Sequence, residues 1–71
     1  MRNKCYPNLR MEMFIKGVSQ MDLARHLGKD KYWIDNRMRG ITKFPEEIKK
    51  SIKNKFFRGM SIEYLFFKGG K

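Results

Sequence analysis

Glycine and proline residues divide this chain into short segments, and that division limits the fold more than any other feature. Both residue types interrupt regular structure, since glycine is flexible and proline lacks an amide proton. The main segments between them are 9 to 13 residues long, and none alternates cleanly between polar and apolar residues. This pattern favours short helices over strands. The punctuating residues are Pro7, Gly17, Gly28, Gly40, Pro45, Gly59, Gly69 and Gly70.

The chain has 71 residues, and we expect a single domain over residues 1–71. A domain of this size buries only about 60% of the surface that its unfolded chain exposes, which leaves little room for a deep substrate pocket. Cys5 is the only cysteine and His26 the only histidine, so an internal disulfide and a four-ligand zinc site are excluded. We therefore expect tight helix packing without metal or cofactor, helped by dimerisation.

Positive charge dominates the composition, with 17 Lys and Arg against 7 Asp and Glu and a net charge of +10. A basic domain attracts polyanions over long distances, which favours nucleic acid as the partner over a purely solubilising role. No apolar run approaches the roughly 20 residues of a membrane span. The N-terminal segment lacks the apolar core of a secretion signal, and a lone cysteine suits a reducing compartment. We expect a cytoplasmic protein of a bacterial cell, without a membrane or small-molecule partner.

Two helices are predicted before Gly28. The first begins after Asn8, which can cap free backbone amides, and its inward face carries Leu9, Met13 and Phe14. The second begins at Ser19, where Asp22 stands three residues later as in a capping box. Its staple and buried stripe comprise Val18, Leu23, Ala24 and Leu27.

Three more helices are predicted after Gly28. Asp30 caps a helix over residues 31–39, whose inward positions are Ile34 and Met38. Pro45 is suited to be the first residue of the next helix, and Ser61 caps a last short one. The fourth helix has an apolar stripe at Ile48, Ile52 and Phe56 and a row of lysines at Lys49, Lys50, Lys53 and Lys55. That row is either a track for a DNA backbone or a solvated face.

The five predicted helices resemble the phage lambda-repressor and Cro-like (XRE-type) helix-turn-helix family. The resemblance covers roughly residues 8 to 66 and implies an all-α bundle of five short helices. In this family a small residue at the position of Ala24 lets two helices cross closely, and Ile34 packs back on the first of them. The residues that carry the resemblance are Leu9-Arg10, Gly17-Val18-Ser19-Gln20, Leu23-Ala24, Leu27-Gly28, Ile34, Gly40 and Ser61-Ile62-Glu63-Tyr64-Leu65.

The resemblance implies that the helix over 31–39 lies in the major groove and reads bases from its N-terminal half. The matching base-contact positions are Lys31, Tyr32, Asp35 and Asn36. Lys31 can donate to guanine, and Asn36 can pair with adenine through two hydrogen bonds. Asp35 is repelled by phosphates unless it accepts from a cytosine amino group. The expected phosphate contacts are Gln20, Arg39, Lys43 and Arg10.

Two of the departures from the family pattern affect how the helix over 31–39 packs. Family members often carry a buried ion pair where this chain has Met13 and Met38, so we predict that these two side chains touch. Arg37 stands where the family prefers an apolar residue. It can lay its stem along the core or stack on Trp33, one turn earlier.

Aromatic residues near the C-terminus exceed what so small a core needs. Phe56 and one of Phe66 or Phe67 are expected inside, and the rest would form an exposed patch; the alternative is that all four point inward. The expected partner or dimer patch is Trp33, Phe57, Phe66 and Phe67. Residues 1–7 are expected to be a basic arm that reaches DNA or is disordered, and residues 67–71 a flexible tail.

The resemblance implies a Cro-like transcriptional regulator that binds double-stranded operator DNA and is not an enzyme. One alternative is an antirepressor that binds a phage repressor, favoured by Asp35, Trp33, Arg37 and the surplus phenylalanines. Another is a basic protein that coats nucleic acid without sequence choice. The expected partners are therefore DNA with a second copy of the chain, or a phage repressor.

Overall fold

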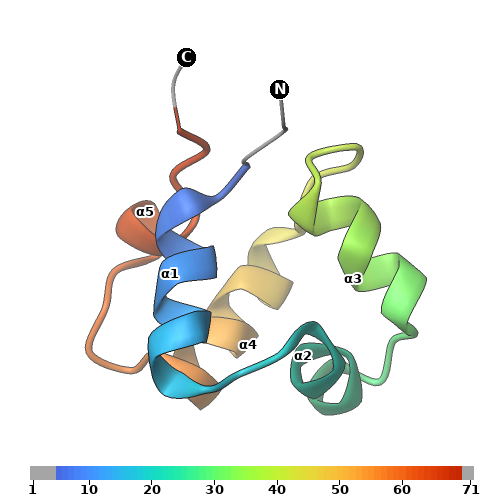
Figure 1. Ribbon diagram of the computed structural model, residues 1–71, viewed down its shortest axis with the longest axis horizontal. Helices are drawn as coiled ribbons and strands as arrows, with labels where there is room; N and C mark the ends of the chain where they lie inside the picture. The colour runs from blue at the N-terminus through green and yellow to red at the C-terminus, as the bar shows by residue number, and fades with distance from the viewer. Residues whose placement is uncertain (1–4, 70–71) are drawn as a thin grey trace.

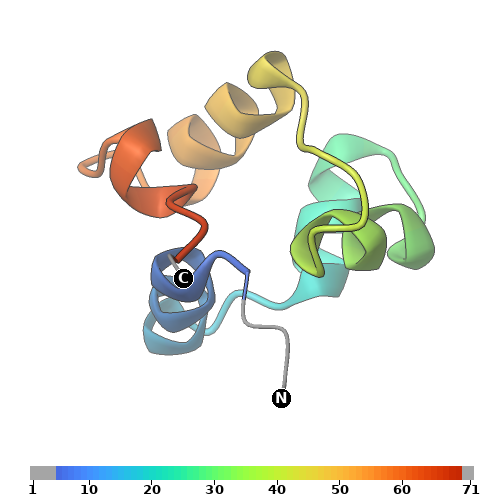
Figure 2. The ribbon, with the colours of Figure 1, turned by 90° about the horizontal axis from the view of Figure 1, so that it is seen from above.

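The computed structural model describes residues 5–69, which contain five helices and no strand, as the all-α prediction requires. Both ribbon views place α1 and α5 on one side of the molecule and α3 on the other (Figures 1 and 2). The Cα trace measures 30 × 26 × 23 Å along its principal axes. The helices are α1 (Pro7–Lys16), α2 (Gln20–Leu27), α3 (Lys31–Met38), α4 (Glu46–Phe56) and α5 (Ile62–Leu65).

Side-chain caps begin three of the helices, at the positions that the sequence predicts. The Ser19 hydroxyl accepts from the Asp22 amide at 3.1 Å, and the Asp22 carboxylate accepts from the Ser19 amide at 2.9 Å. This second bond holds the pKa of Asp22 below its usual value, because it stabilises the charged carboxylate. Asp30 accepts from the Trp33 amide, and Ser61 accepts from the Tyr64 amide. The capping box and the caps of α3 and α5 are therefore confirmed.

The start of α1 differs from the prediction. Pro7 is its first residue and Tyr6 precedes it in the left-handed region at φ 58°. Asn8 is therefore inside the helix, where its side chain donates to the Tyr64 carbonyl at 2.9 Å and ties α1 to α5. The arm expected over residues 1–7 is wrong for Tyr6, which is buried, and for Pro7. Residues 1–4 lie outside the described part of the chain, as do residues 70–71 of the expected tail.

The start of α4 differs from the prediction as well, because it lies one residue later. Pro45 is the residue before the helix, with an extended ψ of 152°, and Glu46 is the first helical residue. Glu46 and Glu47 occupy the first turn, where negative charge is favoured by the helix dipole. Along α4, Ile52 is fully buried and Ile48 and Phe56 pack partly against the core, so the predicted stripe is confirmed.

One apolar core lies between the five helices, and none of the described polar or charged residues is buried in it. Met13 and Met38 are 6% and 1% exposed and belong to the same buried cluster, and direct contact between their side chains stays a prediction. Phe14 was expected inside and is 87% exposed. It lies about 100° further round α1 than Met13, beyond the face that meets the core. The buried residues are Tyr6, Leu9, Met13, Leu23, Ala24, Ile34, Met38, Phe44, Ile52, Phe57, Leu65 and Phe66.

Candidate nucleic-acid interface

The pair α2 and α3 forms the candidate interface. Gly28 ends α2 in the left-handed conformation at φ 69° and ψ 29°, which lets the chain turn sharply into the cap of α3. Ile34 and Met38, four residues apart, are fully buried and fix the inward side of α3. Leu23 and Ala24 of α2 lie in the same core cluster, and Leu27 packs against it. The rest of α3 is therefore held with its polar side outward.

The predicted base-contact residues occupy that outward side. Lys31 and Tyr32 are exposed, with 76% of Tyr32 accessible. Asp35 and Asn36 are half-buried one turn later. The structure thus brings the four residues onto one helix surface, and it leaves the N-terminal half of α3 the most accessible.

The negative charge of Asp35 is offset by a cation at the C-terminal end of the same helix. Its carboxylate lies 3.2 Å from the Arg39 guanidinium, in a pair that is partly open to solvent on both sides. The pair reduces the local repulsion that Asp35 would exert on a phosphate. It also means that Arg39, an expected phosphate contact, is engaged with a carboxylate in this structure.

The other expected phosphate contacts separate into two groups. Gln20 is the first residue of α2 and is half-buried, and Lys43 is exposed in the segment after α3. Arg10 is half-buried, and its guanidinium is engaged with two backbone carbonyls. Its Nε donates to the Cys5 carbonyl and its Nη2 to the Met38 carbonyl, both at 2.8 Å. Arg10 therefore fastens α1 to the end of α3 and satisfies a carbonyl of the final turn.

The expected partner patch is largely absent from the surface. Phe57 is 1% exposed and Phe66 is 7% exposed, so both are corrections to that prediction. Phe66 packs edge to face on Tyr6 and Phe44. Its burial therefore depends on residues far away in the sequence, which a local sequence pattern cannot predict. Phe67 is exposed as expected, at 53%.

Trp33 is half-buried, and two cations lie over its ring. It is therefore not the freely exposed side chain that a partner patch would require. The guanidinium carbon of Arg37 lies 3.7 Å from the ring centroid, and Lys29 Nζ lies at 5.1 Å. Arg37 also donates to the Trp33 carbonyl. Of the two roles considered for Arg37, the stack on Trp33 is confirmed.

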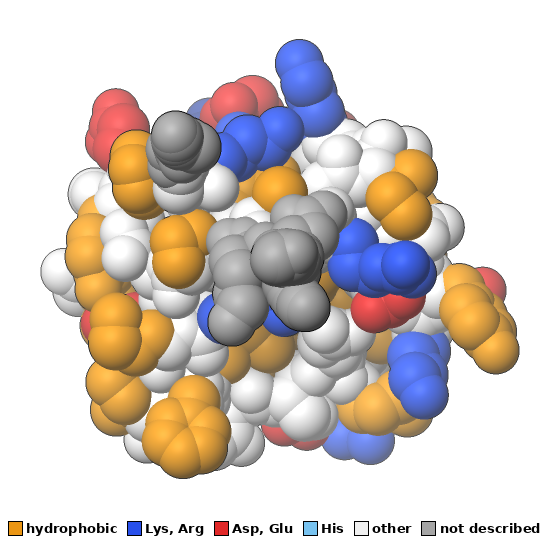
Figure 3. Space-filling view, turned by 45° about the horizontal axis from the view of Figure 1, so that its top comes forward, with side chains coloured by type: hydrophobic (Ala, Val, Ile, Leu, Met, Phe, Trp, Pro, Cys, Tyr) orange, Lys and Arg blue, Asp and Glu red, His pale blue; other side chains and the backbone are white. Residues whose placement is uncertain are grey.

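Three of the exposed apolar side chains lie on one face of α1. Met11, Phe14 and Ile15 are 50%, 87% and 65% exposed, and we call these three residues the α1 stripe. Tyr64 of α5 adjoins this helix through its hydroxyl, which donates to Glu12 at 2.9 Å. Figure 3 shows several hydrophobic side chains along the side of α1 and α5, while most of the Lys and Arg side chains visible in this view lie at the top and on the side of α3.

Two classes of site find no support in the described residues. Within residues 5–69, no three His, Cys, Asp or Glu side chains gather as a metal site would require. None of the helices in that range combines the length and apolar character that crossing a bilayer would require.

A capped helix, a left-handed glycine and a second helix with its polar side exposed define the helix-turn-helix class of DNA-binding domains. A family model described as the KorB domain matches residues 15–65, which include all of α2, α3, α4 and α5. The chain belongs to this KorB domain family, a DNA-binding family of the helix-turn-helix type. Comparisons with curated proteins and with solved structures found no match.

Proposed function

We propose that this DNA-binding protein is a Cro-like phage transcriptional regulator that lays α3 in the major groove of an operator. The observation that carries the proposal is the exposed N-terminal half of α3, presented by a capped and fully packed helix pair. The net charge of +10 supports it, because phosphate neutralisation supplies much of the affinity of such domains. The protein would act by occupying a promoter in the bacterial cytoplasm and not by catalysis.

Each of the four predicted base-contact residues of α3 has a role in this proposal. Lys31 donates to guanine and Asn36 forms two hydrogen bonds with adenine. Tyr32 contacts a thymine methyl group or a phosphate. Asp35 accepts from a cytosine amino group, with Arg39 held beside it to reach the adjacent backbone.

The test is a selection from random duplexes followed by sizing of the complex. A recovered palindrome whose half-sites lie one turn apart, about 34 Å, would support a dimeric regulator. Lys31→Ala and Asn36→Ala should each weaken the selected duplex about 5- to 100-fold and relax one base position. Lys50→Ala, on the exposed side of α4, is the control and should leave the preferred bases unchanged. Recovery of no motif would contradict the proposal.

A second candidate function is an antirepressor that binds the cognate phage repressor. The α1 stripe favours it, because exposed apolar side chains grouped on one helix are typical of protein-binding surfaces. Phe14→Ser with Ile15→Ser should then abolish repressor binding and leave duplex binding intact. Unchanged repressor binding in that variant, with loss through Lys31→Ala, would contradict a role for the stripe.

A further inference from the structure

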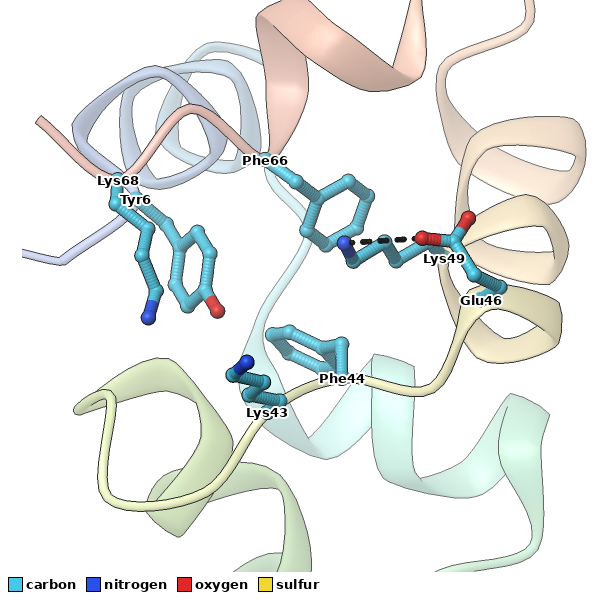
Figure 4. Close-up of a pocket in the computed structure, with 7 residues that line it drawn as sticks. All are labelled: Tyr6, Lys43, Phe44, Glu46, Lys49, Phe66 and Lys68. Carbon is cyan, nitrogen blue, oxygen red and sulfur yellow. Dashed lines mark hydrogen bonds and ion pairs between the residues drawn. The ribbon is translucent and has the colours of Figure 1, made fainter.

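A cavity of about 360 Å³ opens beyond the C-terminal end of α3, among residues from three separate parts of the chain. Its inner wall is made by Tyr6, Phe44 and Phe66, whose rings point toward one another in Figure 4. Three lysines stand around this wall, namely Lys43, Lys49 and Lys68. None of the three lysines lies on α3.

The three rings of this inner wall pack tightly against one another and form the floor of the cavity. Their centroids are 5.3 to 5.9 Å apart and all three pairs meet edge to face. The rings are only 2%, 3% and 7% exposed, so little ring surface is left on which a nucleobase could stack. Burial also raises the pKa of the Tyr6 hydroxyl, which keeps it protonated and able to donate a hydrogen bond.

The charges around the cavity are unbalanced. No hydrogen bond or ion pair joins Lys43 or Lys68 to another residue within 5–69. Lys49 lies 3.5 Å from the Glu46 carboxylate and 5.8 Å from the Phe66 ring centroid, and its side chain is only 23% exposed. One carboxylate therefore faces three ammonium groups, leaving an excess of two positive charges. Like charges around one half-enclosed site repel each other, and a bound anion offsets that repulsion.

We propose that this cavity binds a phosphate group, held by Lys43, Lys49 and Lys68 above the floor of Tyr6, Phe44 and Phe66. A phosphate offers oxygens in several directions, so separate ammonium groups can donate to it at once. The phosphate is either a diester of the DNA backbone or a free phosphate. The proposal goes beyond the reading of bases by α3, and the free-phosphate test does not depend on that function.

The test follows the aromatic NMR signals of Phe44, Phe66 and Tyr6 during titration with inorganic phosphate, pyrophosphate or a short duplex. We expect saturable shifts that sodium chloride of equal ionic strength does not produce. Saturation by phosphate or pyrophosphate without a response to the duplex identifies a free phosphate as the ligand. A response to the duplex that outlasts competition from phosphate identifies the DNA backbone.

The variant pair Lys43→Gln with Lys68→Gln should weaken the response at least tenfold. The control pair Lys16→Gln with Lys50→Gln removes the same charge from exposed positions outside the cavity. If the ligand is the DNA backbone, the cavity variant should also reduce the slope of log affinity against log salt by about 1. The proposal is overturned if no probe shifts the ring signals, or if both variant pairs weaken the response equally. A wild-type protein that binds phosphate and no duplex would contradict the function proposed above and leave the cavity assignment intact.

Discussion

Arg37 sits over the indole of Trp33, with its guanidinium carbon 3.7 Å from the ring centroid. The two residues are one helical turn apart on α3, and Arg37 Nη1 also donates to the Trp33 carbonyl at 3.3 Å. Arg37 Nε is buried and has no hydrogen-bond partner among the described residues. The stack thus gives this half-buried cation a favourable partner on its own helix.

Replacing Arg37 by lysine should destabilise the fold while leaving the outer side of α3 unchanged. Lysine keeps the charge and loses the planar stack, so we expect a loss of about 1 kcal/mol in the free energy of unfolding. Trp33 fluorescence should change because its ring loses its cover. Arg58→Lys, at an exposed position, is the matched control. Equal stability of the two variants would show that the stack contributes nothing.

The capping box should fix the stability of α2 and therefore the seating of α3. Ser19→Ala removes the hydroxyl that accepts from the Asp22 amide, and we expect a loss of about 1 kcal/mol in the free energy of unfolding. Thermal unfolding measures the change. Thr42→Ala, which removes a hydroxyl from an exposed site, should leave the midpoint unchanged.

Asp22 should make stability fall in acid. Its pKa is lowered in the folded state, chiefly by the Ser19 amide, so its contribution is present above the unfolded pKa of about 4. That contribution is lost as the pH drops through the folded value. Unfolding curves between pH 6 and 2 should therefore show a smaller acid dependence for Asp22→Asn than for the unchanged chain. The same dependence in both would contradict the assignment of this shift to the capping bond.

Gly40 lies close to the side chain of Cys5, so a substitution at Gly40 should lower the stability of the fold and a second substitution at Cys5 should recover part of the loss. A methyl group on Gly40 would lie 2.5 Å from Cys5 Sγ, and the residue has a φ of 82°. Gly28 has a similar φ of 69° and open space around it. Gly28→Ala should cost about 1 kcal/mol of strain, and Gly40→Ala should cost about 2 kcal/mol or more.

Cys5→Ala separates the two causes at Gly40. In the Gly40→Ala background it should restore the part of the stability that the clash removes, because the sulfur atom is the nearest neighbour. The strain from the positive φ should remain. A double variant no more stable than Gly40→Ala would show that the sulfur contact plays no part.

The sequence was sufficient to locate the helices because their start and stop signals are local. Ser19, Asp30 and Ser61 each bond an amide within three residues, and Gly28 changes the direction of the chain at its own position. The apolar spacing of Ile34 and Met38 is also a local signal. It correctly predicted which side of α3 faces the core and which faces outward.

Residues with distant partners could not be predicted in this way. Arg10 reaches the carbonyl of Met38, 28 positions along the chain, so its charge alone suggested a surface role. Phe66 is buried by Tyr6 and Phe44, and Phe14 is exposed on α1 although it was expected on the inward face of that helix. The lysine cavity joins residues from both ends of the described chain, which no local motif could reveal.

The most direct test of the central claim is a map of backbone amide shifts in the NMR spectrum when a mixed-sequence duplex is added at low salt. We expect the largest shifts at residues 31–36 and at Gln20, and no change at Phe14 and Ile15 of the α1 stripe. Shifts concentrated on α1 and α5, with residues 31–36 unaffected, would contradict the assignment of α3 as the helix that meets DNA.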